Sequence, residues 1–395
     1  MSQIPELSVV MPCLNEAETL AVCIRKALKS FKDCNIAGEV VIADNGSTDG
    51  SQEIAIHEGA RLVPVAKKGY GNALRGGIEA AAGKWIIMGD ADDSYDFSNI
   101  KPFVEKLREG YELVMGCRLP SGGGTVMPGA MPWKHRWIGN PALTFIGRLL
   151  FKCPAHDFHC GLRAFTKEGF NRIDLRTTGM ELASEFVIKS TLKGLRFTEV
   201  PITLYPDGRS RAPHLRSWRD GWRHLRFMLL FSPRWLFLIP GIILCVLGLT
   251  ALSALALGQM IFGKVVLDVG SMMGASMFLL IGVQLLSFAV FTRVFAVGEG
   301  LLPPNPKLQR ILEAFTLEWG IFLGILTSLI GLGIFGFAFW DWQKAGFQGL
   351  SYGENLRRII PASTLIVIGV QIVFGSFFLG VLGMKTITRP EAPAE

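Results

Sequence analysis

Cysteine is scarce in this 395-residue sequence, and its seven cysteines include no CxxC pair. They are odd in number and scattered along the chain, which argues against a disulfide framework and is typical of a reducing compartment. The opening residues, MSQIPEL, lack both the basic start and the apolar run of a cleaved signal peptide. We therefore expect the amino-terminal half to stay in the cytosol.

The sequence also lacks a recognisable nucleic-acid-binding module, although its formal net charge is +7. Its basic residues gather instead just before the first long apolar stretch, as Arg209, Arg211, Arg216, Arg219, Arg223, Arg226 and Arg234. Arginines in this position are typical of the cytoplasmic flank of a membrane span. The expected partners are therefore anionic lipid or a lipid phosphate, and not nucleic acid.

Charge is rare after about residue 234, where four apolar stretches occupy 235–257, 269–292, 319–340 and 359–384. Each is near or above the ~20 residues that cross a bilayer as a helix. Four spans return both ends of the chain to one side, which predicts a multi-pass protein of the plasma or inner membrane with a cytoplasmic catalytic domain. Lys307, Arg310, Lys385 and Arg389 fit this orientation, whereas Arg357 and Arg358 fall on the outer side.

The first half alternates short apolar runs with segments of helical period. Strands are expected at 7–11, 40–43, 61–65 and 85–88, and helices at 16–32, 51–58 and 70–82. This alternation predicts an α/β fold with a mostly parallel sheet, followed by an all-α transmembrane domain of four helices. The expected parts are a catalytic domain over 1–212, an amphipathic interfacial helix over 213–234, two membrane hairpins over 235–385 and a cytosolic tail over 386–395.

Three further patterns concern the expected connections and helices. Residues 214–231 place tryptophan and leucine beside arginine at helical spacing, which indicates a helix lying on the membrane or, alternatively, one packed on the sheet. The segment IGVQ follows Ser276 and again Ser363 at the same spacing, which predicts a duplicated hairpin. The glycine-rich and proline-rich segment 120–132 predicts a loop long enough to close over a site.

Polar side chains follow three of the expected strands: Asn15 and Glu16, Asp44 and Asn45, Asp90 and Asp92. Each pair alone could simply form a turn. Ligands of parallel sheets bind beyond the carboxyl ends of the strands, so together these residues indicate a site. Carboxylates two apart at a strand end can both reach a divalent ion that also binds a diphosphate.

These segments resemble those of glycosyltransferase family 2, which has a GT-A fold, and most closely its polyprenyl-phosphate (dolichol-phosphate) hexose synthases. The resemblance rests on MPCLNE at 11–16, ADNGSTDG at 43–50, GYGNAL at 69–74, GDAD at 89–92, GCR at 116–118, CGLRAF at 160–165, EVP at 199–201 and RSR at 209–211. It implies a nucleotide-sugar donor, a polyprenyl-phosphate acceptor and Mg²⁺ or Mn²⁺. By resemblance alone, UDP-glucose is the favoured donor.

The resemblance also implies roles for individual residues. Substrate-binding residues at the nucleoside end would be Pro12, Asn15, Glu16, Asp44 and Asn45. Asp90 and Asp92 would bind the metal and diphosphate, with Asp92 and Asp157 as catalytic residues. Arg118, Arg163, Arg209 and Arg211 would bind phosphate groups, the last two on the lipid. Ser94 stands where many relatives have glutamine, which leaves the third metal ligand open, and Cys160 and Leu162 replace the commoner serine and phenylalanine.

The chemistry expected is direct, inverting displacement at the anomeric carbon of the sugar. A phosphate monoester is largely dianionic at neutral pH, with a second pKa near ~6, so the acceptor needs positioning more than deprotonation. Asp157 could then orient a group or act as a base.

Other functions fit the sequence less well. A processive polysaccharide synthase would carry a QxxRW motif, and both Arg-Trp pairs here lack the glutamine. A transporter or flippase with a nucleotide-sugar-binding module would place ionisable residues inside the spans, where Gln284 and Gln371 are the main polar groups. The segment CPAHDFHC at 153–160 is too compact to close a zinc tetrahedron. Gly324, Gly331, Gly333 and Gly336 favour close helix packing, which could extend to a homo-oligomer.

Overall fold

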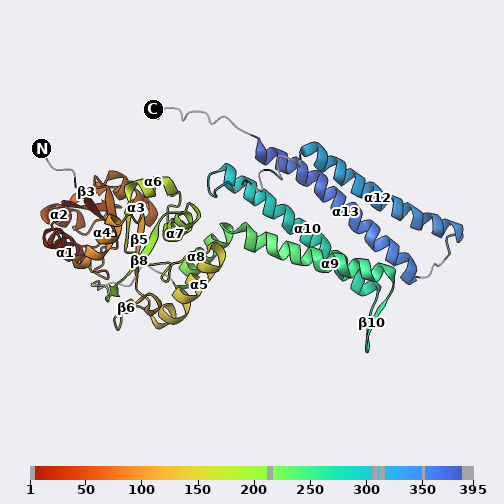
Figure 1. The fold of residues 1–395 in the computed structure, drawn as a ribbon, viewed down its shortest axis with the longest axis horizontal. Coiled ribbons are helices and arrows are strands. Elements are labelled where there is room, and N and C mark those ends of the chain that lie inside the picture. Colours follow the sequence, from red (N-terminus) through yellow and green to blue (C-terminus); the bar gives the residue numbers. More distant parts are fainter. Residues whose placement is uncertain are drawn as a thin grey trace. The chain divides into compact units, whose positions relative to one another are not determined.

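The computed structural model describes residues 5–210, 217–304, 306, 310, 316–348 and 352–384. The chain divides into two compact units, Met1–Met228 and Leu229–Glu395. Strands and helices alternate in the first unit, whereas the second consists of long helices and one small hairpin (Figure 1).

The first unit is built on a seven-stranded sheet with the order β3-β2-β1-β4-β7-β5-β8. Its strands are β1 (Leu7–Cys13), β2 (Gly38–Asp44), β3 (Arg61–Pro64), β4 (Trp85–Met88), β5 (Leu113–Cys117), β7 (Arg163–Thr166) and β8 (Phe197–Pro201). Strand β7 runs antiparallel to β4 and β5, and the other pairings are parallel. The mostly parallel sheet predicted from the sequence is thus confirmed.

Helices pack around this sheet (Figure 1). They are α1 (Leu20–Asp33), α2 (Ser51–His57), α3 (Tyr70–Ala80), α4 (Lys101–Arg108), α6 (Lys167–Ile173) and α7 (Leu182–Leu192), whereas α5 (Asn140–Phe151) packs against α7. Strand β1 is apolar almost throughout because both of its faces are buried, as is usual for a central parallel strand. Helix α1 begins at Leu20, four residues later than predicted, because Asn15 adopts a positive φ of 61° and residues 16–19 form a turn.

The predicted loop over 120–132 contains short regular structure. It holds a 3-10 turn, η2 (Pro120–Gly122), and the two-residue strand β6 (Thr125–Val126), which pairs with β9 (Thr203–Leu204). A π-helical turn, η3 (His135–Gly139), then leads into α5. The segment is therefore tied to the region that follows β8.

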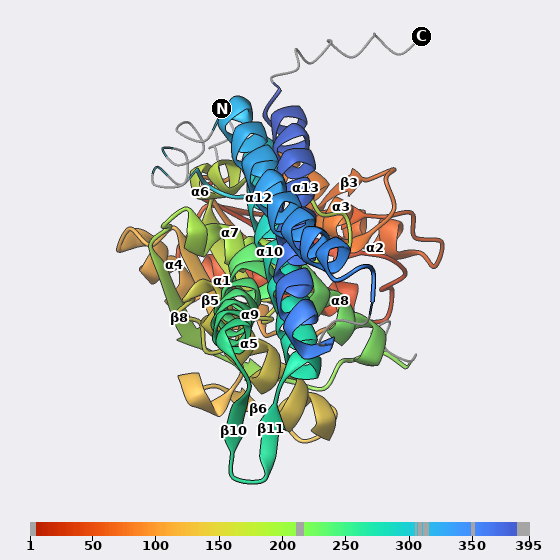
Figure 2. The same ribbon diagram turned by 90° about the vertical axis from the view of Figure 1, so that its right-hand side faces the viewer.

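The second unit contains η4 (Arg234–Leu238), α9 (Ile239–Leu257), α10 (Val269–Gly298), α12 (Leu317–Lys344) and α13 (Tyr352–Gly383). Four of its helical segments are long and apolar enough to cross a membrane. Helix α9 packs with α10, α12 packs with α13, and α10 lies against α13 (Figure 2). A β-hairpin that the sequence analysis did not foresee, β10 (Met260–Phe262) with β11 (Val265–Leu267), joins α9 to α10.

Glycines mark the helix crossings in both hairpins. A methyl group on Gly248 would lie 2.5 Å from the backbone nitrogen of Leu279, and one on Gly331 would lie 2.9 Å from that of Ile366. Leu279 and Ile366 hold equivalent places in the two copies of the repeat, so the crossings agree with a duplicated hairpin. The copies also meet directly, since Gln371 Nε2 donates to Gln284 Oε1 at 3.2 Å.

Of the four glycines expected to favour close packing in α12, Gly324 and Gly331 lie against α13. Gly333 and Gly336 face open space, because a methyl group added at either position would meet no described atom within 4 Å. The expectation therefore holds for one face of the helix.

Arg357 and Arg358, the two arginines on the expected outer side of the membrane, each form an ion pair with an aspartate. Arg357 Nη2 lies 2.5 Å from Asp268 Oδ1, and Arg358 Nη1 lies 2.6 Å from Asp341 Oδ2. Each positive charge is therefore offset by an aspartate at the end of a neighbouring helix.

Candidate active site

The loops after β1 and β2 are bound together by the residues predicted at the nucleoside end. The Asp44 carboxylate accepts N–H bonds from Gly46 at 2.9 Å and Ser47 at 3.2 Å. The backbone nitrogen of Asn15 donates to Ser47 Oγ at 2.9 Å, and Asn15 Oδ1 accepts from the backbone nitrogen of Thr48 at 2.8 Å. Asn15 and Asp44 thus shape the loops, and β1–β2 pairing sets half-buried Pro12 opposite Ala43.

Asn45 fixes the segment that leads into α3. Its Nδ2 donates to the carbonyl oxygens of Val65 at 2.9 Å and Lys67 at 2.8 Å, and its Oδ1 accepts from the backbone nitrogen of Gly69 at 2.8 Å. Three strand ends are therefore joined through amide and carboxylate side chains that the sequence analysis singled out.

Asp90 and Asp92 follow β4 directly. Tyr70 donates its hydroxyl to Asp90 Oδ1 at 2.9 Å. Burial and then the charge of Asp92 raise the pKa of Asp90 from 3.8 to about 6. Asp92 Oδ1 accepts from the backbone nitrogen of Ser94 at 3.1 Å and from Ser94 Oγ at 2.6 Å. Ser94 thus supports Asp92.

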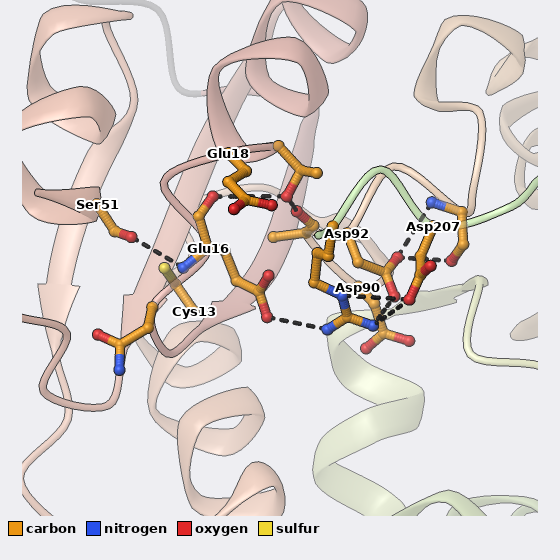
Figure 3. Close-up of polar contacts among 12 residues, drawn as sticks. Cys13, Glu16, Glu18, Ser51, Asp90, Asp92 and Asp207 are labelled. Carbon is orange, nitrogen blue, oxygen red and sulfur yellow. Dashed lines mark hydrogen bonds and ion pairs between the residues drawn. The ribbon is translucent and has the colours of Figure 1, made fainter. Parts of the chain in front are cut away.

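Four acidic side chains lie close together, and we call them the carboxylate cluster: Glu16, Asp90, Asp92 and Asp207 (Figure 3). Arg209 forms ion pairs with Glu16, Asp92 and Asp207. Its Nη1 is 3.2 Å from Glu16 Oε1, and its Nη2 is 2.9 Å from Asp92 Oδ2. Burial lowers the pKa of Arg209, but the charge of Asp92 and the bond to Asp207 outweigh it, and the pKa is raised. The cluster therefore already holds one cation.

The donor set of the cluster fits a divalent ion. Carboxylate oxygens are the ligands of Mg²⁺ and Mn²⁺, and the Arg209 guanidinium shows that a positive charge is stable beside Asp92. Within the described ranges no three His, Cys, Asp or Glu side chains are grouped to hold a metal by themselves. A site of this kind would be completed by substrate phosphates, as is usual for Mg²⁺.

Arg118 and Asp157 form a buried ion pair. Arg118 Nε lies 2.7 Å from Asp157 Oδ2, Nη2 lies 2.8 Å from Oδ1, and the Arg118 backbone nitrogen also donates to Oδ2 at 3.0 Å. Burial alone would lower the pKa of Arg118, but the charge of Asp157 raises it well above its ordinary value. Asp157 has no exposed surface, whereas 8% of Arg118 is exposed.

Arg163 is fully buried on β7, between β4 and β5. Its guanidinium donates to the carbonyl oxygens of Cys160 at 2.8 Å and Ala183 at 2.8 Å and lies over the Phe186 ring. Burial lowers its pKa. In this structure the guanidinium is hydrogen-bonded to backbone carbonyl groups, and no part of the side chain is exposed to a phosphate. The other predicted phosphate-binding residue, Arg211, falls outside the described residues.

The histidines of the segment 153–160 are bound to other polar groups. The Glu199 carboxylate accepts from the backbone nitrogens of His156 at 2.8 Å and Asp157 at 3.1 Å. His159 Nε2 lies 3.1 Å from Ser184 Oγ, and burial lowers the pKa of His159 well below its ordinary value. Glu199 therefore holds the loop that presents Asp157.

Large apolar side chains are exposed around η3 and α5, which the sequence analysis did not single out. They are Trp133, Trp137, Ile138, Phe145 and Leu149, and we call them the aromatic patch. Lys134, Arg136, Arg148 and Lys152 are interspersed with them in the sequence. The same mixture of tryptophan and basic residues that drew attention to 214–231 could have revealed this segment.

Comparison with known proteins gives consistent matches. Residues 8–174 match Glycosyl transferase family 2, and residues 290–383 match the glycosyltransferase family 2 C-terminal transmembrane region. The chain is 38% identical over 380 residues to the low-salt glycan biosynthesis hexosyltransferase Agl6 of Haloferax volcanii, covering 96% of this chain and 89% of the relative. It is 29% identical over 197 residues to a dolichyl-phosphate hexose transferase of the same organism, and this match covers 50% of this chain and 82% of the relative.

Among solved structures, the chain is similar to glucosyl-3-phosphoglycerate synthase from Mycobacterium tuberculosis in complex with Mn²⁺ and UDP-glucose. The TM-score is 0.45 and the sequence identity 22%, and the match covers 57% of this chain and 78% of that chain. The match to Agl6 spans both units of the chain. The resemblance inferred from the strand-end motifs is thus confirmed: the chain is a membrane protein that belongs to glycosyltransferase family 2.

Proposed function

We propose that the protein transfers a hexose from a nucleotide sugar to a polyprenyl phosphate, with inversion at the anomeric carbon. The observation that carries the proposal is the carboxylate cluster, whose members follow β1, β4 and β9. Its acidic groups suit a diphosphate bound through a divalent cation, and a nucleoside diphosphate is the leaving group of such a transfer. Two similar proteins are named as a hexosyltransferase and a dolichyl-phosphate hexose transferase.

Asp90 and Asp92 are the proposed metal ligands. Mg²⁺ or Mn²⁺ bound there would neutralise charge on the departing diphosphate. Pro12, Asn15, Asp44 and Asn45 would form the nucleoside end, with the last three acting chiefly through the loops that they hold in place. UDP-glucose remains the favoured donor on family resemblance.

Arg118 is the proposed phosphate contact in the acceptor region, and Asp157 its positioning residue. The bidentate pair fixes the plane of the guanidinium, and Asp157 has no exposed surface from which to take a proton from a lipid. The acceptor phosphate is already a nucleophile at neutral pH. Arg209 and Arg211 would add positive charge for the lipid phosphate.

The aromatic patch is the proposed membrane contact of the catalytic unit. Tryptophan and phenylalanine enter the interfacial region of a bilayer, and nearby lysine and arginine bind anionic headgroups. A catalytic unit that contacts the cytoplasmic face of the membrane in this way would meet its lipid substrate there. The arginines before the first span support catalysis on that face.

Transfer of labelled sugar tests the proposal. Purified protein would be given a panel of UDP-sugars and GDP-sugars with undecaprenyl phosphate and Mn²⁺ or Mg²⁺, and the lipid product would be separated and its anomer determined. We expect one donor to be transferred, with inversion, and EDTA to stop the reaction. Failure with every donor would refute the lipid phosphate as acceptor, and a retained anomer would refute direct displacement.

A further inference from the structure

The position of Arg209 bears directly on metal binding. Its guanidinium uses all three nitrogens: besides Glu16 and Asp92, it reaches Asp207 Oδ2 from Nη2 at 3.0 Å and from Nε at 3.3 Å. Only 12% of the side chain is exposed. Three carboxylates from separate segments thus converge on one guanidinium.

Asp92 is fully engaged in this arrangement. Ser94 donates twice to its Oδ1, and Arg209 donates to its Oδ2. A divalent ion ligated by Asp92 would lie within a few ångströms of the guanidinium, and like charges at that separation repel strongly where water is largely excluded. The ion and the guanidinium therefore compete for the same carboxylate.

We infer that Arg209 is an internal counter-cation, which a divalent metal must displace from Asp92, and whose guanidinium is thereby released to bind a phosphate group. The inference rests on the proposed function, because it takes Asp92 as a metal ligand. It makes the metal and the phosphate-binding arginine interdependent, so that the phosphate contact forms once the metal is bound. Until then the carboxylate cluster keeps a compensating charge.

The side chain can leave without its backbone. The segment that carries Arg209 is held by hydrogen bonds from Tyr205 N to Ser94 O at 3.0 Å and from Gly208 N to Asp92 O at 3.0 Å. Ser210 N also donates to Glu18 Oε2 at 2.7 Å. These contacts flank Arg209 on both sides and do not involve its guanidinium. Rotation of a long side chain from an anchored segment is therefore sufficient.

Binding of Mn²⁺ alone tests the competition without any substrate. Free Mn²⁺ would be measured by electron paramagnetic resonance on the full-length protein in nanodiscs, for the wild type, Arg209→Gln and Arg61→Gln. Arg61 is the matched control, since it loses the same charge from an exposed pair with Glu39. We expect Arg209→Gln to bind Mn²⁺ about fivefold more tightly, as removal of an ion pair of ordinary strength allows, and Arg61→Gln to bind as the wild type does.

A chemical readout on the unaltered protein removes any dependence on the fold of a variant. Phenylglyoxal modification would be quantified by mass spectrometry at Arg209 and Arg61, with and without Mn²⁺. Release predicts that Mn²⁺ raises the rate at Arg209 and leaves Arg61 unchanged. Equal Mn²⁺ affinity in the wild type and Arg209→Gln, or slower modification of Arg209 with Mn²⁺, would overturn the inference and leave the proposed transfer intact. Absence of Mn²⁺ binding from both proteins would overturn it together with the proposed metal site.

Discussion

Replacement of Asp157 by asparagine probes the buried pair with Arg118. The pair has two charge-assisted side-chain bonds of 2.7 Å and 2.8 Å, and a third bond from the Arg118 backbone at 3.0 Å. Asparagine keeps the shape of the side chain and removes the charge that compensates the guanidinium. Removal of one partner of a buried pair costs about 3–5 kcal/mol. For a unit of this size that corresponds to a fall in Tm of about 6–20 °C.

The assay is thermal unfolding of the purified full-length protein, followed by intrinsic fluorescence. Asp174→Asn serves as the control, because Asp174 pairs with Arg176 at the surface, where both side chains are about half exposed and the pair contributes ~1 kcal/mol or less. The double variant Asp157→Leu with Arg118→Met should recover much of the lost stability, since it leaves no buried charge without a partner. A Tm of Asp157→Asn equal to that of the wild type would refute the argument.

The same variant separates two roles in catalysis. A positioning residue predicts a lower rate with an unchanged shape of the pH–rate profile, measured at a temperature where the variant is folded. A general base predicts that the acidic limb of the profile disappears. Loss of that limb in Asp157→Asn would contradict the positioning role.

Other predictions concern packing, charge and membrane contact. Gly331→Leu should lower the Tm of the membrane unit, because a methyl group at position 331 would meet the backbone of α13. Gly333→Leu should leave the Tm unchanged, because position 333 faces open space. Equal effects of the two variants would contradict the close packing of α12 on α13. In the folded protein, burial and the charge of Asp92 raise the pKa of Asp90 from 3.8 to about 6. Between these two pH values the folded chain therefore keeps a proton on Asp90 that the unfolded chain has lost. Stability of the metal-free protein, measured by denaturant unfolding, should therefore rise as pH falls from about 7 to 5, and Asp90→Asn should lose this component. An environment-sensitive dye on a cysteine at position 137 should shift to the blue in anionic liposomes. One at position 56, where exposed Ile56 has no phenylalanine, tyrosine or tryptophan near it in the sequence, should not; equal shifts would contradict a specific membrane patch.

The sheet and its acidic edge could be predicted because they depend on local patterns. Strand β4 has the predicted bounds, since a short apolar run between polar residues leaves little choice of strand. The carboxyl ends of parallel strands share one edge, which brought Glu16 and Asp92 to the same arginine. The identity of that arginine also came from a sequence motif, although its ion pairs with Glu16 and Asp92 did not.

The parts that escaped prediction depend on contacts between distant segments. Arg118 and Asp157 each stood out as site residues, but their mutual bond spans 39 positions and appears only when β5 and the loop before β7 meet. Arg163 belongs to a motif expected to bind phosphate, yet its strand is enclosed between two others. The hairpin of β10 and β11 has strands of three residues, too short for a periodic signal.

The measurement that tests the central claim most directly is sugar transfer to a lipid phosphate by Asp92→Asn and Asp93→Asn, side by side, at saturating Mn²⁺. Both changes remove one negative charge from the same loop, but Asp92 belongs to the carboxylate cluster, whereas Asp93 pairs with Lys26 on α1 at 2.7 Å. We predict that Asp92→Asn abolishes metal-dependent transfer and that Asp93→Asn retains most of it. Transfer by Asp92→Asn at the wild-type rate would contradict the assignment of this cluster as the active site.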